Sequence, residues 1–161
     1  MTTAQKLSRQ LNKLRGSKIV LVGIGNVLKG DDAAGPLVCQ RLKECGTSTD
    51  IIDAGTALEN YIQRIIKKAP QNLLIIDAID FQAPPGTIKI FTPSQLNPSV
   101  ISTHALSPRL FVDLVSRSIK VNVYFIGIQP ANTGLGDSMS SQVCQAARQL
   151  AQTLIDVFPS I

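Results

Sequence analysis

The sequence predicts an α/β fold in which helices cover both faces of a mostly parallel sheet. Short apolar runs at 19–24, 50–54 and 73–79 alternate with segments of helical spacing, which is the pattern of a parallel sheet. Only seven residues separate Ile79 from Thr87, whereas a parallel crossover needs about a dozen. The strand expected at 87–92 should therefore run antiparallel to the strand before it, on an edge of the sheet.

The remaining elements follow from the same periodicities. Pro36 is tolerated only in the first turn of a helix, so the helix after the first strand should begin near residue 33. The second helix should stop near Lys68, because two lysines and then Pro70 close its apolar spacing. Helices are expected at 33–44, 58–68, 109–116 and 140–158. A turn-rich segment is expected at 93–107, and the last strand at 120–128.

The composition indicates a folded domain and excludes several classes of protein. The chain has 161 residues, of which 44% are hydrophobic and 17% charged, so it is not intrinsically disordered. No apolar run approaches the ~20 residues of a membrane span, and residues 1–15 lack the apolar core of a secretory signal. Cys39, Cys45 and Cys144 form no CxxC pair. We therefore expect reduced thiols and a cytoplasmic protein.

The excess positive charge lies in an N-terminal arm. Residues 1–18 hold five of the 16 basic side chains and none of the 11 acidic ones, so the rest of the chain is neutral. A neutral body argues against a nucleic-acid-binding face. Leu7, Leu11 and Leu14 have the spacing of an amphipathic helix that packs on the domain. We divide the chain into this arm, 1–17, and one α/β domain, 18–161; docking to an anionic partner or organelle targeting are the alternatives for the arm.

The segment after the first strand, GIGNVLKGDDAAGP at 23–36, begins like a dinucleotide-binding fingerprint but departs from it. Leu28 stands where the third glycine is needed, and Asp31 and Asp32 would repel a pyrophosphate at the helix start. A nucleotide-binding module is therefore disfavoured. Asp31 stands where a helix N-cap is expected, whereas Asp32 is better placed to point into a crevice.

Two further polar residues are candidates for chemistry. Asp77 emerges at the carboxyl end of a buried strand, where open α/β sheets bind ligands, so it should face Asp32. His104 is the only histidine, in a loop after the antiparallel strand. Two carboxylates and an imidazole are a reasonable set of three metal ligands, compatible with zinc, nickel, manganese or ferrous iron. A turn-capping Asp77 and a solvated His104 are the alternatives.

Taken in order, these motifs resemble the hydrogenase maturation endopeptidases, which trim the C-terminal extension of the large subunit of nickel–iron hydrogenases. The resemblance runs from Lys18 to about Phe158. The opening segment 23–36 is the most specific part, and the others are DAGT at 53–56, LIIDA at 74–78, PGT at 85–87, STH at 102–104 and GIQP at 127–130.

The resemblance implies a three-layer α/β/α sandwich of five strands, one of them antiparallel. It implies that Asp32, Asp77 and His104 bind metal, with Asp31 a secondary candidate. The substrate would be the hydrogenase large-subunit precursor, which would carry the nickel itself, although the protease could bind another divalent ion such as zinc. We expect a monomer.

The resemblance leaves the mechanism open. A metal could polarise the scissile carbonyl or activate water, with Asp31, Asp32 or Asp77 as general base. Alternatively, two carboxylates could share a proton, as in aspartic proteases. A non-catalytic nickel-binding maturation chaperone is the competing function, since the same three residues would serve it.

Overall fold

The computed structural model describes residues 1–96 and 106–161 and contains a five-stranded sheet of order β2-β1-β3-β5-β4. All neighbouring strands are parallel except β4, which runs antiparallel to β5. The strands are β1 (Ile19–Ile24), β2 (Asp50–Gly55), β3 (Asn72–Ala78), β4 (Ile88–Phe91) and β5 (Asn122–Ile128). The helices are α1 (Thr3–Asn12), α2 (Ala34–Cys45), α3 (Ile62–Lys68), α4 (Pro108–Ser116) and α5 (Ser141–Val157), with 3₁₀ turns η1 (Gly30–Ala33), η2 (Leu58–Tyr61) and η3 (Pro93–Gln95).

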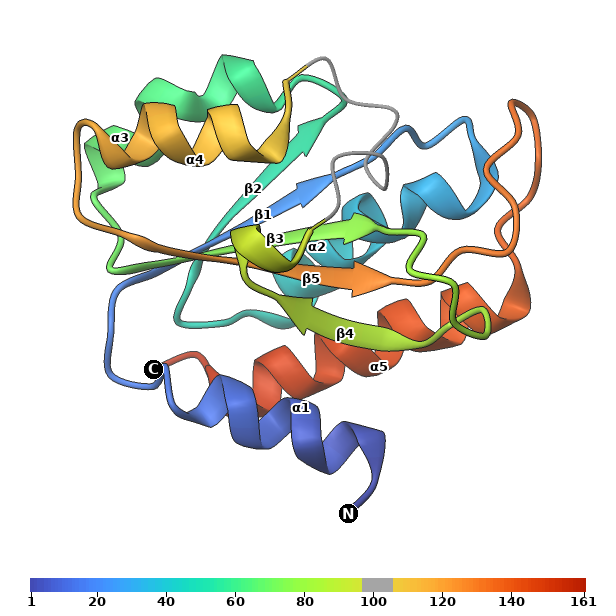
Figure 1. The fold of residues 1–161 in the computed structure, drawn as a ribbon. Coiled ribbons are helices and arrows are strands. Elements are labelled where there is room, and N and C mark those ends of the chain that lie inside the picture. The colour runs from blue at the N-terminus through green and yellow to red at the C-terminus, as the bar shows by residue number, and fades with distance from the viewer. Residues whose placement is uncertain (97–105) are drawn as a thin grey trace.

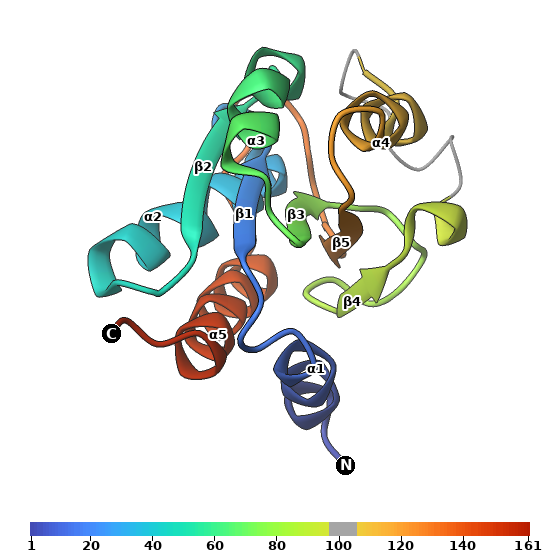
Figure 2. The ribbon, with the colours of Figure 1, turned by 90° about the vertical axis from the view of Figure 1, so that its left-hand side faces the viewer.

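Helices cover both faces of this sheet, as the two views show (Figures 1 and 2). Helices α1, α2 and α5 lie on one face, where their apolar side chains pack with Leu74 and Ile76 of β3. Helices α3 and α4 lie on the other face, where they pack with Leu73 and Ile75. Alternate residues of β3 thus enter opposite cores, which explains why the central strands are continuous apolar runs.

The expected mixed sheet is confirmed, with one refinement. Strand β4 is an edge strand antiparallel to β3 in direction, as the short 79–87 connection requires, but its hydrogen-bonded neighbour is β5. β5 pairs with β3 along its whole length and so separates the two. The predicted helix over 58–68 also begins as the 3₁₀ turn η2 before it becomes α3.

The basic arm forms the expected amphipathic helix. Leu7 and Leu11 of α1 are buried in the core that α5 shares, while the basic side chains of the arm are exposed. Thr2 and Gln5 close the start of the helix with a reciprocal pair of hydrogen bonds. Within the part of the chain that the structure describes, no helix is both long enough and apolar enough to cross a bilayer.

A close backbone contact sets α2 directly on the carboxyl ends of β1 and β3. At Gly35, in the first turn of α2, an added Cβ would lie 2.6 Å from the carbonyl oxygen of Ile76 and would also overlap that of Ile24. Only glycine permits this approach. In the dinucleotide-binding fingerprint the third glycine allows close helix–strand packing, and Leu28 prevents it at that position. Gly35 allows this packing instead, and η1 consequently contacts β3.

Gly35→Ala should lower the free energy of unfolding by about 2–4 kcal/mol, because neither carbonyl oxygen can move without disturbing the sheet. Gly16→Ala is a matched control: Gly16 has a φ of +82° but no atom within 4 Å of its added Cβ. The control should cost only about 1 kcal/mol of backbone strain. Chemical denaturation of both variants checks the difference, and equal losses would contradict the role of Gly35.

Candidate active site

The sheet reverses its strand order between β1 and β3, so a crevice is expected beyond the carboxyl ends of these two strands. β1 ends at Ile24 and leads through a turn into η1, which contacts β3. Asp77 is the penultimate residue of β3. The candidate residues Asp31 and Asp32 are therefore contributed by η1, which follows β1, and Asp77 is contributed by β3.

Asp31 is fully buried, and both of its carboxylate oxygens are occupied by hydrogen bonds. Oδ1 accepts from the backbone N–H of Ser140 at 2.7 Å. Oδ2 accepts from the N–H groups of Ala131 at 2.8 Å and Asn132 at 3.1 Å, and from the Ser140 hydroxyl at 2.9 Å. Asp31 therefore fastens η1 to the segment between β5 and α5.

This arrangement corrects the expectation that Asp31 caps the helix that follows it. Its carboxylate acts on the start of a different helix, because Ser140 is the N-cap residue of α5. Burial alone would raise the pKa of Asp31, but the hydrogen bonds from Ala131, Ser140 and Asn132 outweigh it and lower the pKa. A carboxylate held so firmly in its ionised form is a poor general base.

Asp32 is differently placed, although it is the next residue. It is 3% exposed, and its Oδ2 accepts the backbone N–H of Asn26 at 2.8 Å. Among the residues that the structure describes, no group donates a hydrogen bond to its Oδ1. Asn26 is itself fixed in a turn, since its side-chain oxygen accepts the N–H of Leu28. Asp32 thus has one oxygen that orients the carboxylate and a second that can bind a ligand.

Asp77, close to the end of β3, is 1% exposed. Ile76, which precedes it, pairs with Gly23 of β1 and contacts Gly35 of α2, so Asp77 lies at the same end of the sheet as η1. His104 lies outside the described residues. Within 1–96 and 106–161, no three His, Cys, Asp or Glu side chains form a group able to hold a metal ion. The predicted three-ligand set stays a prediction.

Gln129 fixes the loop that follows Asp77. It belongs to the GIQP motif at 127–130, for which the sequence alone indicated no role. Its Oε1 accepts the N–H groups of Phe81 at 2.8 Å and Ala83 at 3.2 Å. Its Nε2 donates to Asp80 Oδ1 at 3.1 Å and to the carbonyl of Pro130. Segment 129–140 therefore anchors both loops of the crevice, one through Gln129 and the other through Asp31.

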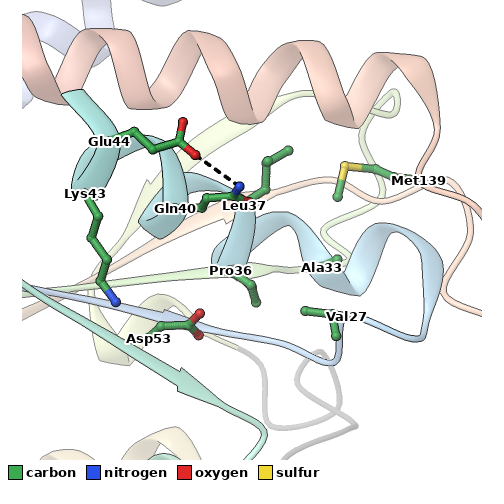
Figure 3. Close-up of a pocket in the computed structure, with 9 residues that line it drawn as sticks. All are labelled: Val27, Ala33, Pro36, Leu37, Gln40, Lys43, Glu44, Asp53 and Met139. Carbon is green, nitrogen blue, oxygen red and sulfur yellow. Dashed lines mark hydrogen bonds between the residues drawn. The ribbon is translucent and has the colours of Figure 1, made fainter.

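A hollow of about 650 Å³ opens on the surface of α2 beside the turn that holds Asp32 (Figure 3). Asp53 of β2 and Lys43 of α2 lie at one end of it, and Val27 and Met139 at the other. The sequence displays the motif at 53–56 but does not indicate that Asp53 lines a hollow. The nearby Cys39 is buried and faces β2; burial, and then the charge of Asp53, raise its pKa to about 12, so it is no nucleophile.

Comparison with known proteins identifies the family. A family model described as hydrogenase maturation protease, HycI, matches residues 36–157. The chain belongs to the hydrogenase maturation protease family. The hydrogenase 3 maturation protease of Escherichia coli K12 is 34% identical over 140 residues, which is 84% of this chain and 87% of that protein.

Solved structures of the family have the same fold. The crystal structure of the [NiFe] hydrogenase maturation protease HycI from Thermococcus kodakarensis has a TM-score of 0.83 and 31% identity, covering 92% of this chain and 97% of its own. The solution structure of HycI from Escherichia coli has a TM-score of 0.76 and 33% identity, covering 85% and 88%. The family resemblance and the five-stranded fold expected from the sequence are both confirmed.

The hydrogen bonds of Asp31 lead to a pH-dependent prediction. Because its folded-state pKa is lowered, ionised Asp31 stabilises the fold above about pH 4, and this contribution is lost as the pH falls through the folded-state pKa. Asp31→Asn places an N–H₂ group among N–H donors and should cost about 2–4 kcal/mol at pH 7. The loss should begin to shrink below about pH 4, where the carboxyl of the unfolded wild-type chain becomes protonated, and it should go on shrinking until the pH has passed the lowered folded-state pKa.

Thermal or urea unfolding between pH 3 and pH 7 measures this difference. Asp113→Asn is the control, because Asp113 is an exposed residue of α4 and should change stability by less than about 0.5 kcal/mol. If the Asp31→Asn loss were the same at every pH, the ionised carboxylate would not be the source of the stabilisation.

Proposed function

We propose that this protein is an endopeptidase that removes the C-terminal extension of a nickel–iron hydrogenase large-subunit precursor after nickel has been inserted. Its family supports proteolysis of a hydrogenase subunit. The observation that carries the site assignment is the contrast between two adjacent aspartates: both oxygens of Asp31 are held by hydrogen bonds, whereas Oδ1 of Asp32 is available. Asp32 is therefore the working carboxylate of the 23–36 segment.

The proposed reaction is hydrolysis of one peptide bond. A carboxylate, Asp32 or Asp77, takes a proton from water as the oxygen attacks the scissile carbonyl carbon. The same proton then passes to the leaving nitrogen as the C–N bond breaks, so the products are a new carboxyl terminus and a released peptide. Burial of both aspartates excludes bulk water and strengthens the electrostatic interactions in the site. Asp31 serves as a positioning residue.

The nickel is proposed to arrive with the precursor as part of the substrate. Asp32, Asp77 and His104 offer two carboxylates and an imidazole, donors that suit a divalent ion but hold it less tightly than thiolates would. These residues would probe the substrate's nickel, which polarises a carbonyl or water when bound. This arrangement makes cleavage depend on the substrate's nickel. The encounter is proposed to occur in the cytoplasm, between one copy of this chain and one precursor.

The protein should therefore cut a nickel-loaded precursor and leave a nickel-free precursor intact. Treating the protease with a chelator, and then removing the chelator, should not change cleavage of the loaded precursor, because the required ion is in the substrate. Intact-mass measurement of the large subunit reads the result as the loss of one C-terminal peptide.

Two controls separate the alternatives. His104→Ala should abolish cleavage of the loaded precursor, whereas Cys45→Ala, an exposed position, should not affect it. Equal cleavage of loaded and nickel-free precursor would remove nickel as the condition for cutting. Tight binding of the loaded precursor without any cleavage would favour the non-catalytic nickel-binding chaperone instead.

A further inference from the structure

Exposed aliphatic side chains gather on the two loops that Asp31 joins. Val27 is 66% exposed, Leu28 64% and Leu135 76%. Apart from the terminal Met1 and Ile161, the described residues include one other exposed large hydrophobic side chain, Leu110 on α4. We call Val27, Leu28 and Leu135 the aliphatic rim. Such a concentration on two joined loops is typical of an interaction surface rather than of scattered surface residues.

Hydrogen bonds hold the rim in place. Leu28 and Leu135 lie close together, because the carbonyl of Leu28 accepts the N–H of Gly136 at 2.8 Å. The N–H of Leu28 is bound by Asn26, and the turn that contains Leu135 is closed by Asp137, whose side chain accepts the N–H of Gly134 at 2.9 Å. The leucines are therefore presented on fixed turns, and binding through them would cost little ordering of this protein.

The rim continues into the hollow over α2. Val27 belongs to both, and the adjoining wall of the hollow is apolar, formed by Ala33, Pro36, Leu37 and Met139 (Figure 3). A volume of about 650 Å³ is within the usual range for ligand-binding clefts, roughly 300–1,000 Å³. The rim and the apolar end of the hollow together make one continuous apolar surface, while Gln40, Lys43, Glu44 and Asp53 line the other end of the hollow.

This surface includes the chain neighbours of the proposed working carboxylate and of the residue that binds it. Ala33 follows Asp32 in the chain, and Val27 follows Asn26, whose N–H donates to Asp32. Val27 and Ala33 are therefore within reach of a polypeptide whose scissile bond lies at Asp32. The surface also adjoins β2, an edge strand that pairs with β1 on one side, and an edge strand can receive an extended chain.

We propose that the aliphatic rim and the hollow dock an apolar, extended segment of the precursor polypeptide next to the bond that is cut. The proposal rests on the proposed function, since the occupant is its substrate. Docking here selects a precursor by the side chains flanking its cleavage site, separately from the nickel that the carboxylates and His104 probe. In this proposal the rim and the hollow bind the polypeptide, whereas the carboxylates and His104 bind the nickel.

The test compares Leu28→Ser/Leu135→Ser with Leu110→Ser. All three leucines are exposed, so the variants should fold as the wild type does. The affinity for immobilised nickel-loaded precursor should fall at least tenfold in the rim variant, because two apolar contacts are lost, and stay within twofold for Leu110→Ser. Cleavage should show a raised KM and a kcat within twofold. Leu28→Met/Leu135→Met should restore both values.

Unchanged affinity and KM in the rim variant, or an equal loss in Leu110→Ser, would overturn the docking proposal. A wild-type dimer in analytical ultracentrifugation that the rim substitutions dissociate, with precursor affinity unchanged, would also overturn it in favour of a second copy as occupant. The affinity measurement does not need cleavage. A precursor that binds through the rim but is never cut would contradict the proposed function and leave the docking surface standing.

Discussion

A single buried charge organises the carboxyl-terminal end of the sheet. Asp31 has no exposed surface, and an ionised carboxylate in that position is tolerated only if its oxygens are hydrogen-bonded. The N–H groups of Ala131, Asn132 and Ser140, with the Ser140 hydroxyl, meet this requirement. The turn after β1 and the start of α5 are consequently held together, although they are about a hundred residues apart in the chain.

This constraint explains why neighbouring aspartates have different roles. Because Asp31 points to the segment before α5, Asp32 is directed elsewhere and binds the N–H of Asn26 with one oxygen. Gly35, one turn further along, seats the helix against Ile24 and Ile76 and so places η1 beside the end of β3. Gln129 then fixes the loop beyond Asp77. Hydrogen bonds from backbone N–H groups thus support the site on both sides.

Local patterns in the sequence were sufficient for the fold but only for part of the site. Apolar runs and the short connection before Thr87 predicted the mixed sheet because strand periodicity and crossover length are local properties. Asp32 and Asp77 could be singled out as candidates because one stands at a helix start and the other at a strand end. For Asp31, the local pattern suggested a helix cap as one alternative, and that alternative is wrong because the partners of its carboxylate lie 100 or more residues away. The packing of Gly35 against the strands and the hydrogen bonds of Gln129 to the loop after Asp77 likewise depend on tertiary contacts that no local pattern reveals.

The division between the two adjacent aspartates is tested most directly by comparing Asp31→Asn with Asp32→Asn. Both stability and single-turnover cleavage of a nickel-loaded precursor should be measured, well below the melting temperature of either variant. Asp32→Asn should melt near the wild type and cut nothing, whereas Asp31→Asn should melt lower and still cut. The reverse result, with Asp32→Asn active or with Asp31→Asn fully stable but inactive, would contradict the assignment of Asp32 as the working carboxylate and Asp31 as its support.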